Sequence, residues 1–191
     1  MKKIAITGVI ASGKSEVCKI IESLGEEVIY TDKINNELLN DKDYQQKLLL
    51  IFPNCIKNDK VDKSLIRQEI LQNDDKRKAL NSLAHAEIKL KVEKIMQKIN
   101  KKTIFVEIPL IVESNMVEYF DEIWCVVTDY NTKVDRIIKR DKVTEKDAEK
   151  IIDTQKKDSE LIAISNKVIH NNGNLNKLEE EVKELVCTMI K

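Results

Sequence analysis

The feature that most constrains the fold of this chain is the stretch GVIASGKS at residues 8–15. The chain has 191 residues but only four glycines, and two of them, Gly8 and Gly13, lie five residues apart here. Lys14 and Ser15 follow directly. The stretch therefore matches the pattern G-x-x-x-x-G-K-[ST] at every fixed position.

This pattern is typical of a loop whose backbone N–H groups surround a phosphate. Glycines permit the positive φ angles and the close approach that such a loop needs. The lysine reaches the β- and γ-phosphates, the serine hydroxyl ligates Mg²⁺, and the next helix presents its positive N-terminal dipole to the anion. We therefore expect a bound nucleoside triphosphate; the alternative is a tight turn with a solvated lysine. The expected nucleotide-binding residues are Gly8, Ala11, Ser12, Gly13, Lys14, Ser15 and Glu16, with Ser15 as the Mg²⁺ ligand.

Five short apolar segments are expected to form β-strands, and several of them are continuous apolar runs rather than alternating ones. A continuous run is typical of a strand covered on both faces, as in a parallel sheet. Helical patterns lie between the segments, so the order favours a parallel α/β sheet. The expected strands are KKIAIT (2–7), EEVIYT (26–31), KTIFVEI (102–108), EIWCVV (122–127) and KVIHN (167–171).

Four helical patterns accompany these strands. The first follows the glycine-rich stretch and ends before Gly25, which is typical of a helix terminator. The others cover 130–141, 144–157 and 174–190. Thr144 is the expected N-cap of the helix over 144–157, because acidic residues fill the turn after it.

One region breaks the alternation of strands and helices. From about Ile34 to Asn100 the sequence predicts only helices, including a long one from about Asp75. We expect residues 34–100 to form an inserted helical domain that holds a substrate. The remaining residues, 1–33 and 101–191, then form the nucleotide-binding core.

The charge balance and the apolar pattern limit the partners of this chain. Its 33 basic and 33 acidic residues cancel, so no overall field recruits nucleic acid or an acidic membrane. The apolar run at the N-terminus is short, no signal-peptide cleavage site follows it, and nothing approaches the length of a membrane span. We expect a cytoplasmic protein that is a monomer or a small homo-oligomer.

The cysteines and histidines argue against a metal site of the zinc type. The four cysteines are scattered without a C-x-x-C pair, and only two histidines occur. This pattern favours a reducing compartment over a disulfide framework. The cysteines are Cys18, Cys55, Cys125 and Cys187.

Among nucleotide-binding classes, a small-molecule kinase fits best. A GTPase needs an N-K-x-D guanine reader, and NKVI at 166–169 lacks the aspartate. A motor or helicase would need a longer chain. A small-molecule kinase needs an acidic group near the acceptor hydroxyl, and two carboxylates follow expected strands.

Asp32 and Glu107 are these carboxylates. Asp32 is expected to end the strand beside the one that leads into the glycine-rich loop, at the edge where parallel sheets bind ligands. It could accept or orient the proton of the acceptor hydroxyl and help to hold the metal, or it could cap a helix over 33–39. Glu107 could act through metal-bound water or substrate, or be an exposed charge at a strand end.

Two of the only four arginines, Arg136 and Arg140, lie four residues apart on one helix face. Arginine offers a rigid fork suited to phosphate, so the pair predicts a phosphate clamp. The stretch KRDKVTEKD would then be a mobile lid between two helices. The alternative is a solvated helix face in which the arginines pair with Asp135 and Asp141.

The order of these motifs resembles that of dephospho-coenzyme A kinases nearly from end to end. The most specific features are PLIVE at 109–113, the R-x-x-x-R-D lid with Gln155 downstream, and a final V-I-x-N-x-G. The segments that carry the resemblance are GVIASGKS, VIYTDKI, VDKSLIRQEI, LAHAEI, VEIPLIVES, VDRIIKRDKVTEKDAEKIIDTQ and VIHNNGNLNKL.

The resemblance implies transfer of a phosphoryl group from ATP, with Mg²⁺, to the ribose 3′-hydroxyl of dephospho-CoA. This reaction is the last step of coenzyme A synthesis. The implied fold is an α/β, P-loop NTPase-type three-layer fold with a five-stranded parallel sheet. The inserted helical domain would receive the coenzyme A portion, and a helical lid at about 136–157 would close over the phosphates.

The resemblance also implies roles for single residues. His85 could instead be a locally satisfied residue at a helix start, and Asn171 and Gly173 could form an ordinary strand-to-helix turn. The implied catalytic residues are Lys14, Asp32 and Arg140. The residues implied at the acceptor are Asp32, His85, Glu107, Pro109, Leu110 and Arg136, and those at the nucleotide include Arg140, Asn171 and Gly173.

The chain departs from the family pattern at five positions, and none of them falls in the glycine-rich loop. Two alternatives stay open: a nucleoside or nucleotide kinase of the same fold, and a regulatory module that binds ATP without transferring phosphate. The departures are Tyr30 for an aspartate, Lys63 and Lys150 for arginines, Ala86 for a proline and Asn166 for an aspartate.

Overall fold

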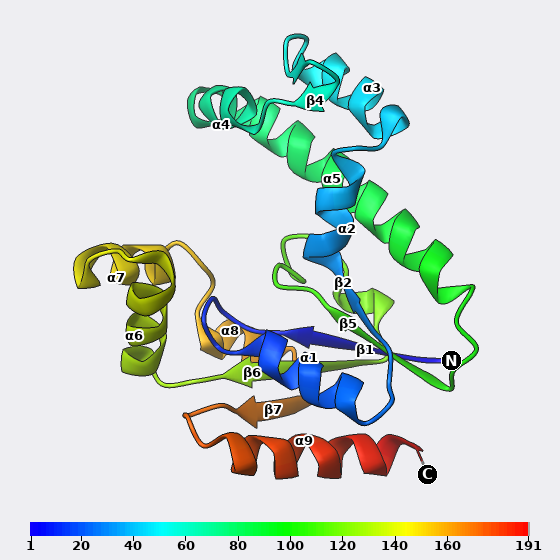
Figure 1. The fold of residues 1–191 in the computed structure, drawn as a ribbon, viewed down its shortest axis with the longest axis vertical. Coiled ribbons are helices and arrows are strands. Elements are labelled where there is room, and N and C mark those ends of the chain that lie inside the picture. The colour runs from blue at the N-terminus through cyan, green and yellow to red at the C-terminus, as the bar shows by residue number, and fades with distance from the viewer. Residues whose placement is uncertain (191) are drawn as a thin grey trace. The chain divides into compact units, whose positions relative to one another are not determined.

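Five strands form one sheet in this computed structural model, which describes residues 1–190 (Figure 1). Their order is β2-β5-β1-β6-β7. The central strand β1 pairs in parallel with both neighbours, with Ile6 opposite Glu107 and Thr7 opposite Cys125. The predicted parallel α/β fold is confirmed. The strands are β1 (Lys2–Thr7), β2 (Val28–Tyr30), β5 (Thr103–Glu107), β6 (Glu122–Val127) and β7 (Lys167–His170).

The continuous apolar runs of the sequence form the core of this sheet. Every residue of β5 is buried, and so are the last five residues of β6. Phe105 and Trp124 meet edge to face, with ring centroids 5.5 Å apart. This burial on both faces anchors the strands, so that their carboxyl ends form a fixed edge for the loops that follow.

The chain divides into two compact units. The first comprises Met1–Ile29 and Lys101–Lys191, and the second comprises Tyr30–Asn100. In the first unit α1 packs against α9, α6 against α7, and α8 against β6. Its helices are α1 (Lys14–Ser23), α6 (Tyr130–Asp141), α7 (Glu145–Asp153), α8 (Asp158–Ala163), α9 (Leu175–Ile190) and the short 3₁₀ turn η1 (Val117–Tyr119).

The second unit is built around its longest helix, α5, against which α2, α3 and α4 pack. Asp41 and Asp62 cap α3 and α4 through their carboxylates, each accepting two backbone N–H bonds. Such caps satisfy N–H groups that a helix start leaves without partners. The helices are α2 (Thr31–Leu38), α3 (Lys42–Ile51), α4 (Lys63–Gln72) and α5 (Asp74–Met96).

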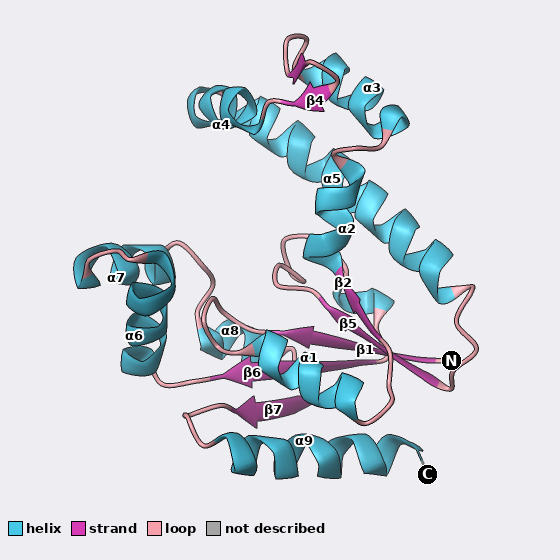
Figure 2. Ribbon diagram, in the orientation of Figure 1, coloured by secondary structure: helices cyan, strands magenta, loops and turns pink. Residues whose placement is uncertain are grey.

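The prediction that residues 34–100 contain only helices is wrong. Strands β3 (Ile56–Lys57) and β4 (Lys60–Val61) form a small antiparallel hairpin (Figure 2). Asn58 and Asp59 join them, with φ angles of 49° and 60°. Two central residues with positive φ favour a tight two-residue hairpin, and Asn and Asp tolerate that conformation well.

The predicted neighbour of the strand that leads into the loop is also wrong. β5, rather than β2, lies beside β1, and β2 is at the edge of the sheet. After β1 and α1 the chain forms β2 at the edge of the sheet. It then forms the helical unit, and β5 follows and lies between β2 and β1. Glu107 therefore ends the strand beside β1, and Asp32 follows the edge strand.

The helix predicted over 144–157 is shorter than expected. Thr144 caps α7, as predicted, because its side chain accepts from the Asp147 N–H. The helix ends at Asp153, and a separate helix, α8, begins at Asp158. The four residues between them return the chain toward the sheet.

Asn166, one of the departures from the family pattern, has a clear structural role. Its Oδ1 accepts from the Ile123 N–H at 2.8 Å, and its own N–H donates to the Ile123 carbonyl at 2.8 Å. These two hydrogen bonds extend the β6–β7 pairing by one residue before β7 begins. An aspartate would offer the same acceptor oxygen, so the change to asparagine preserves this contact.

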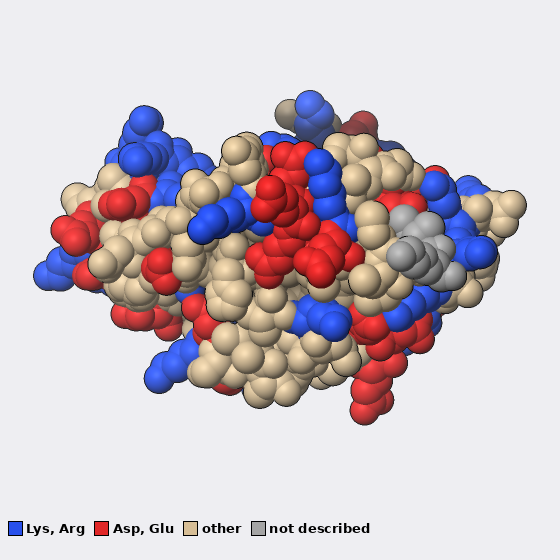
Figure 3. All heavy atoms as spheres, turned by 90° about the horizontal axis from the view of Figure 1, so that it is seen from below, with Lys and Arg blue, Asp and Glu red and all other residues tan. Residues whose placement is uncertain are grey.

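Surface charge is distributed unevenly despite the balanced total. On the face shown in Figure 3, Asp and Glu side chains gather near the centre, and Lys and Arg side chains lie around them. Across residues 1–190, helices that combine the length and apolar character of a membrane span are absent.

Candidate active site

The loop between β1 and α1 has the conformation that the glycine pattern predicts. Gly13 has φ 94°, and a Cβ there would lie 1.9 Å from Nδ2 of Asn171. A Cβ on Gly8 would lie 2.4 Å from the backbone oxygen of Val126. Both positions therefore exclude any side chain. Ala11 also has a positive φ, 60°, although it is not glycine.

The lysine of the motif holds this loop together. Lys14 Nζ donates to the carbonyl oxygens of Gly8, at 2.9 Å, and Val9, at 3.2 Å. Within residues 1–190, no side chain caps the start of α1, where Gly13 is the N-cap. An α-helix start without a side-chain cap, behind a glycine loop, is a ready site for a phosphate. Glu16, predicted at the nucleotide, lies in the first turn of this helix.

Ser15 and Glu107 come together at the carboxyl edge of the sheet. Ser15 Oγ donates to Glu107 Oε1 at 3.4 Å. Glu107 is buried, with 9% of its surface exposed, so the alternative of an exposed strand-end charge is wrong. Two hard oxygen ligands side by side fit Mg²⁺, which takes few protein ligands and completes its shell with water and phosphate oxygens.

Arg136 and Asn171 support the loop through hydrogen bonds to its carbonyl groups. The Arg136 guanidinium donates to the carbonyls of Ala11, at 3.0 Å, and Ser12, at 3.3 Å, and to both oxygens of Asn171. Asn171 Nδ2 donates to the Ser12 carbonyl at 3.0 Å. The alternative in which Arg136 faces solvent beside Asp135 is therefore wrong, because its fork is used on the loop.

Arg140 differs from Arg136 although it lies one turn further along α6. It is exposed, and its guanidinium forms a two-pronged ion pair with Asp141, at 2.7 and 2.8 Å. These hydrogen bonds lower the pKa of Asp141 and raise that of Arg140. The predicted pairing of Arg140 with Asp141 is present in the structure.

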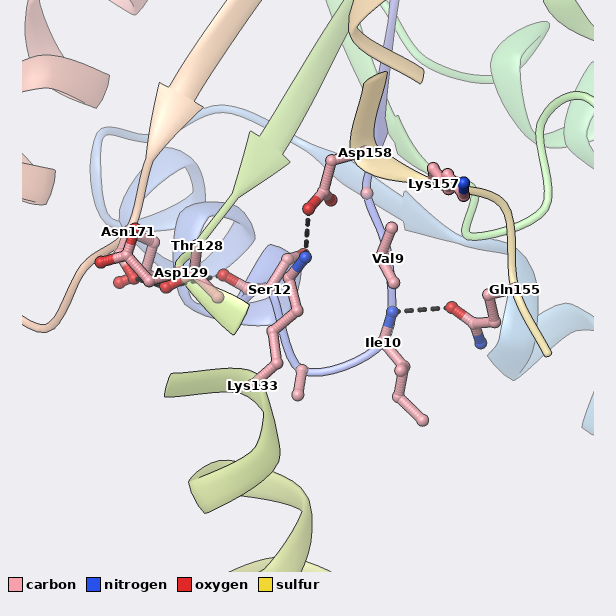
Figure 4. Close-up of polar contacts among 12 residues, drawn as sticks. Val9, Ile10, Ser12, Thr128, Asp129, Lys133, Gln155, Lys157, Asp158 and Asn171 are labelled. Atoms are coloured by element: carbon pink, nitrogen blue, oxygen red, sulfur yellow. Dashed lines mark hydrogen bonds and ion pairs between the residues drawn. The ribbon is translucent and has the colours of Figure 1, made fainter. Parts of the chain in front are cut away.

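Figure 4 shows two further contacts, neither of which the sequence motifs predict. The Ile10 N–H donates to Gln155 Oε1 at 2.8 Å, and Lys133 forms an ion pair with Asp158. Lys133 is buried, on the same face of α6 as Val134 and Ile137. A lysine at an apolar-face position is the sequence signal that points to such a buried pair.

Buried thiols near the loop have no acidic character. Burial raises the pKa of Cys125, in β6, to about 11. Burial also raises the pKa of Cys18 in α1, and the nearby Glu107 carboxylate adds to the effect. Both groups stay protonated at neutral pH, so neither supplies a nucleophile here.

The remaining predicted site residues of the first unit lie on segments that follow strands. Pro109, half-buried, and Leu110, exposed, lie in the segment after β5, beginning two residues beyond its end. Gly173 has φ 97° and lies in the exposed turn between β7 and α9. A turn that needs positive φ explains that glycine whatever else it contacts.

In the second unit, the positions of Asp32 and His85 show that two alternatives are wrong: Asp32 as a helix cap and His85 at a helix start. Asp32 is exposed in the first turn of α2, whose N-cap is Tyr30, so Asp32 is not the N-cap. His85 lies half-buried inside α5, so it is not at a helix start. Beside Asp32, the Lys33 ammonium lies 4.0 Å from the centroid of the Tyr30 ring.

The fold and this site together define a P-loop kinase. The glycine loop, its lysine and the Ser15–Glu107 pair lie at the carboxyl edge of a parallel sheet. The loop packs against α6, which carries both arginines, and against α7.

Comparisons with known proteins give the family. A model of the family described as dephospho-CoA kinase matches residues 2–177. A dephospho-CoA kinase of Fusobacterium nucleatum is 34% identical over 188 residues, with 97% of each chain covered. The chain therefore belongs to the dephospho-CoA kinase family.

Solved structures agree with this assignment. A dephospho-CoA kinase from Campylobacter jejuni superposes with a TM-score of 0.76 and 27% identity, covering 100% of this chain and 98% of that one. A crystal structure from Thermus thermophilus gives a TM-score of 0.85 over 98% of this chain and 97% of the other. At 22% identity, the latter comparison supports the fold alone.

Proposed function

We propose that this chain transfers the terminal phosphoryl group of ATP to the ribose 3′-hydroxyl of dephospho-CoA, giving coenzyme A and ADP. Membership of the dephospho-CoA kinase family supports ATP-dependent phosphorylation of dephospho-CoA in coenzyme A synthesis. The observation that carries the proposal is the complete phosphate-binding loop, with Ser15 and Glu107 3.4 Å apart beside it.

The loop is the proposed site for the ATP phosphates. The backbone N–H groups around Gly13 and the start of α1 would bind the phosphate oxygens, and Lys14 would exchange its two carbonyl partners for them. Ser15 and Glu107 would hold Mg²⁺. The ion, when bound, supplies charge neutralisation for the transferring group. Asn171 and Gly173 are proposed to lie toward the adenine end.

Asp32 is the proposed general base or orienting group for the acceptor hydroxyl. Its exposed carboxylate lies in the first turn of α2, two residues after the end of β2, and a carboxylate that orients a hydroxyl is a common requirement of phosphoryl transfer. Arg140 is proposed to contact the phosphates and to neutralise charge in the transition state. Because Arg140 is exposed, its partner Asp141 can be exchanged for phosphate at little cost.

The helical unit, Tyr30–Asn100, is the proposed domain for the coenzyme A portion of the acceptor. His85 is proposed to contact the acceptor from this unit. Pro109, Leu110 and Arg136 are also proposed acceptor-binding residues. Arg136 would do so while keeping its hydrogen bonds to the loop.

Residues 136–157 are proposed to act as a lid over the phosphates. They comprise the end of α6, all of α7 and the return segment before α8. Closure should make these residues less sensitive to protease when ATP and dephospho-CoA are present together. Equal cleavage with and without the two substrates would contradict closure.

We also propose that the protein acts in the cytoplasm as a monomer or small homo-oligomer, on small molecules rather than nucleic acid or membranes. The balance of 33 basic and 33 acidic residues supports small-molecule substrates. Sedimentation at several protein concentrations would test the oligomeric state.

The proposed reaction can be tested with one coupled assay of ADP release. Dephospho-CoA should be the preferred acceptor, with adenosine and nucleoside monophosphates as comparisons. Asp32→Asn should lower kcat about 100-fold or more, because the variant loses the acid–base group. The control is Asp75→Asn, a change of another exposed aspartate at a helix start.

Three results would contradict the proposal. Faster turnover of a nucleoside or nucleotide would indicate a different kinase. ATP binding without ADP release on any acceptor would indicate a regulatory module. Wild-type turnover by Asp32→Asn would remove the proposed role of Asp32.

A further inference from the structure

The phosphate-binding loop is strained at Ala11, and this strain is held on both sides by residues that precede and follow α7. Ala11 has φ 60°, a conformation that non-glycine residues rarely adopt. Such strain persists only where the surroundings fix it. The residue before Ala11 is held by Gln155, and the carbonyl of Ala11 itself is held by Arg136.

The contact before the strained residue is a single hydrogen bond. The Ile10 N–H donates to Gln155 Oε1 at 2.8 Å, as Figure 4 shows. The side chains of Ile10 and Ala11 also pack against an apolar cluster formed by α6 and α7. The cluster consists of Val134, Ile137, Ala148 and Ile152.

The position of Gln155 depends on α7. Its N–H donates to the Ile152 carbonyl at 3.1 Å, which continues the last turn of that helix. The side chain is half-buried and reaches the loop from the segment that leads to α8. A displacement of α7 would therefore move the acceptor oxygen away from the Ile10 N–H.

We propose that Gln155 is a positioning residue for ATP. It acts through the Ile10 N–H, keeps Ala11 in its strained conformation and thereby keeps the following amides turned toward the phosphates. Because Gln155 is attached to α7, the shape of the loop depends on where α7 lies, and phosphate binding in turn favours this position of α7. The inference rests on the proposed ATP site and not on the identity of the acceptor.

The first test is direct ATP binding to Gln155→Met, which keeps the length and shape of the side chain but removes the acceptor oxygen. Loss of one hydrogen bond that fixes the loop should weaken ATP binding about 10-fold by titration calorimetry. The matched control is Gln97→Met, an exposed glutamine just after α5, which should bind ATP like the wild type. Gln155→Asn, too short to reach the amide, should behave like Gln155→Met.

A second test separates positioning from a merely structural role. Glycine adopts positive φ readily, so in an Ala11→Gly background the loop needs less support. There, Gln155→Met should weaken ATP binding less than threefold, well below its effect on the wild type. Kinetics should agree: the KM for ATP should rise, while the KM for dephospho-CoA at saturating ATP should stay within about twofold.

Each of three outcomes would overturn the inference. The first is unchanged ATP binding by Gln155→Met. The second is an equal loss of binding in the wild-type and Ala11→Gly backgrounds. The third is an equal rise of both KM values, which would indicate a general loss of structure. ATP binding is measured without acceptor, so these results test the role of Gln155 even if the proposed reaction with dephospho-CoA is not observed.

Discussion

The two ends of α6 carry the same kinds of side chain but use them differently. At the inner end, Lys133 is buried against Asp158, and Arg136 donates to loop carbonyls. At the outer end, Lys139 is exposed, and Arg140 pairs with its sequence neighbour Asp141. Sequence spacing places Arg136 and Arg140 on one face, and the structure gives them different partners.

This difference indicates that the inner cations of α6 have a structural role and that its outer arginine is available to a ligand. The inner cations, Lys133 and Arg136, bind oxygen atoms of the protein itself. Arg136 thereby holds α6 against the phosphate-binding loop. Among the described residues, the outer cation Arg140 forms an ion pair only with the solvent-exposed Asp141, so it can exchange that partner for a ligand. Four predictions test this contrast, ordered by the expected change in the free energy of unfolding.

The largest effect is expected from Lys133→Met. The side chain of Lys133 is 4% exposed, and removal of its charge leaves Asp158 partly buried without a counter-ion. Breaking such a pair should lower the free energy of unfolding by about 3 kcal/mol. Urea denaturation measures this change, and Lys139→Met on the same helix serves as the control. An equal effect of both changes would contradict the proposed difference between the two ends.

A smaller loss of stability is expected from Arg136→Met. The change removes charge-assisted hydrogen bonds to three carbonyl groups and should cost about 2 kcal/mol in unfolding free energy. ATP binding should also weaken, because the support behind the loop is lost. Arg136→Lys should recover only part of both, since a point charge cannot reproduce the fork. Full recovery by lysine would show that charge alone matters.

Arg140→Met should leave the unfolding free energy within about 0.5 kcal/mol of the wild type, because its ion pair is exposed. Its kcat should nevertheless fall about 100-fold or more if Arg140 neutralises the transition state as proposed. Parallel denaturation and ADP-release measurements separate the two quantities. A large loss of stability, or an unchanged kcat, would contradict this role and would indicate that Arg140 is structural, like Lys133 and Arg136.

The smallest effect concerns acid pH. The hydrogen bonds from Arg140 hold the pKa of Asp141 below its ordinary value of 3.8. The resulting stabilisation is complete above that ordinary value and is lost as pH falls through the lower, folded-state pKa, below about pH 4.

Asp141→Asn should therefore lose slightly less stability than the wild type between about pH 5 and about pH 3. The two proteins can be compared by their urea midpoints at each pH. An identical decline in both would show that this ion pair does not contribute to acid sensitivity.

The local chemistry of the site could be predicted from sequence because it depends on short spacings. The glycine pattern fixes the loop over residues 8–15. The contact between Ser15 and Glu107, 92 residues apart, depends instead on the position of β5 beside β1, which the apolar runs do not specify. The five strands and the cap at Thr144 follow from apolar runs and turn residues in the same way.

What sequence spacing could not supply was the choice of partner over long separations. The Ile10–Gln155 contact spans 145 residues, and Arg136 reaches Ala11 over 125. The side-chain direction of Arg136 depends on how α6 packs, which a helical repeat does not specify. The Asn58–Asp59 turn, by contrast, carried a readable local signal for a hairpin.

The position of β5 between β2 and β1 has a consequence for synthesis of the chain. Within residues 1–190, β1 pairs only with β5 and β6, and the edge strand β2 reaches the sheet only through β5. A nascent chain thus cannot form any pair of this sheet until Thr103 and the residues after it have left the ribosome. Until then the apolar first strand has no partner, and helices are the only sizeable structure available to the growing polypeptide.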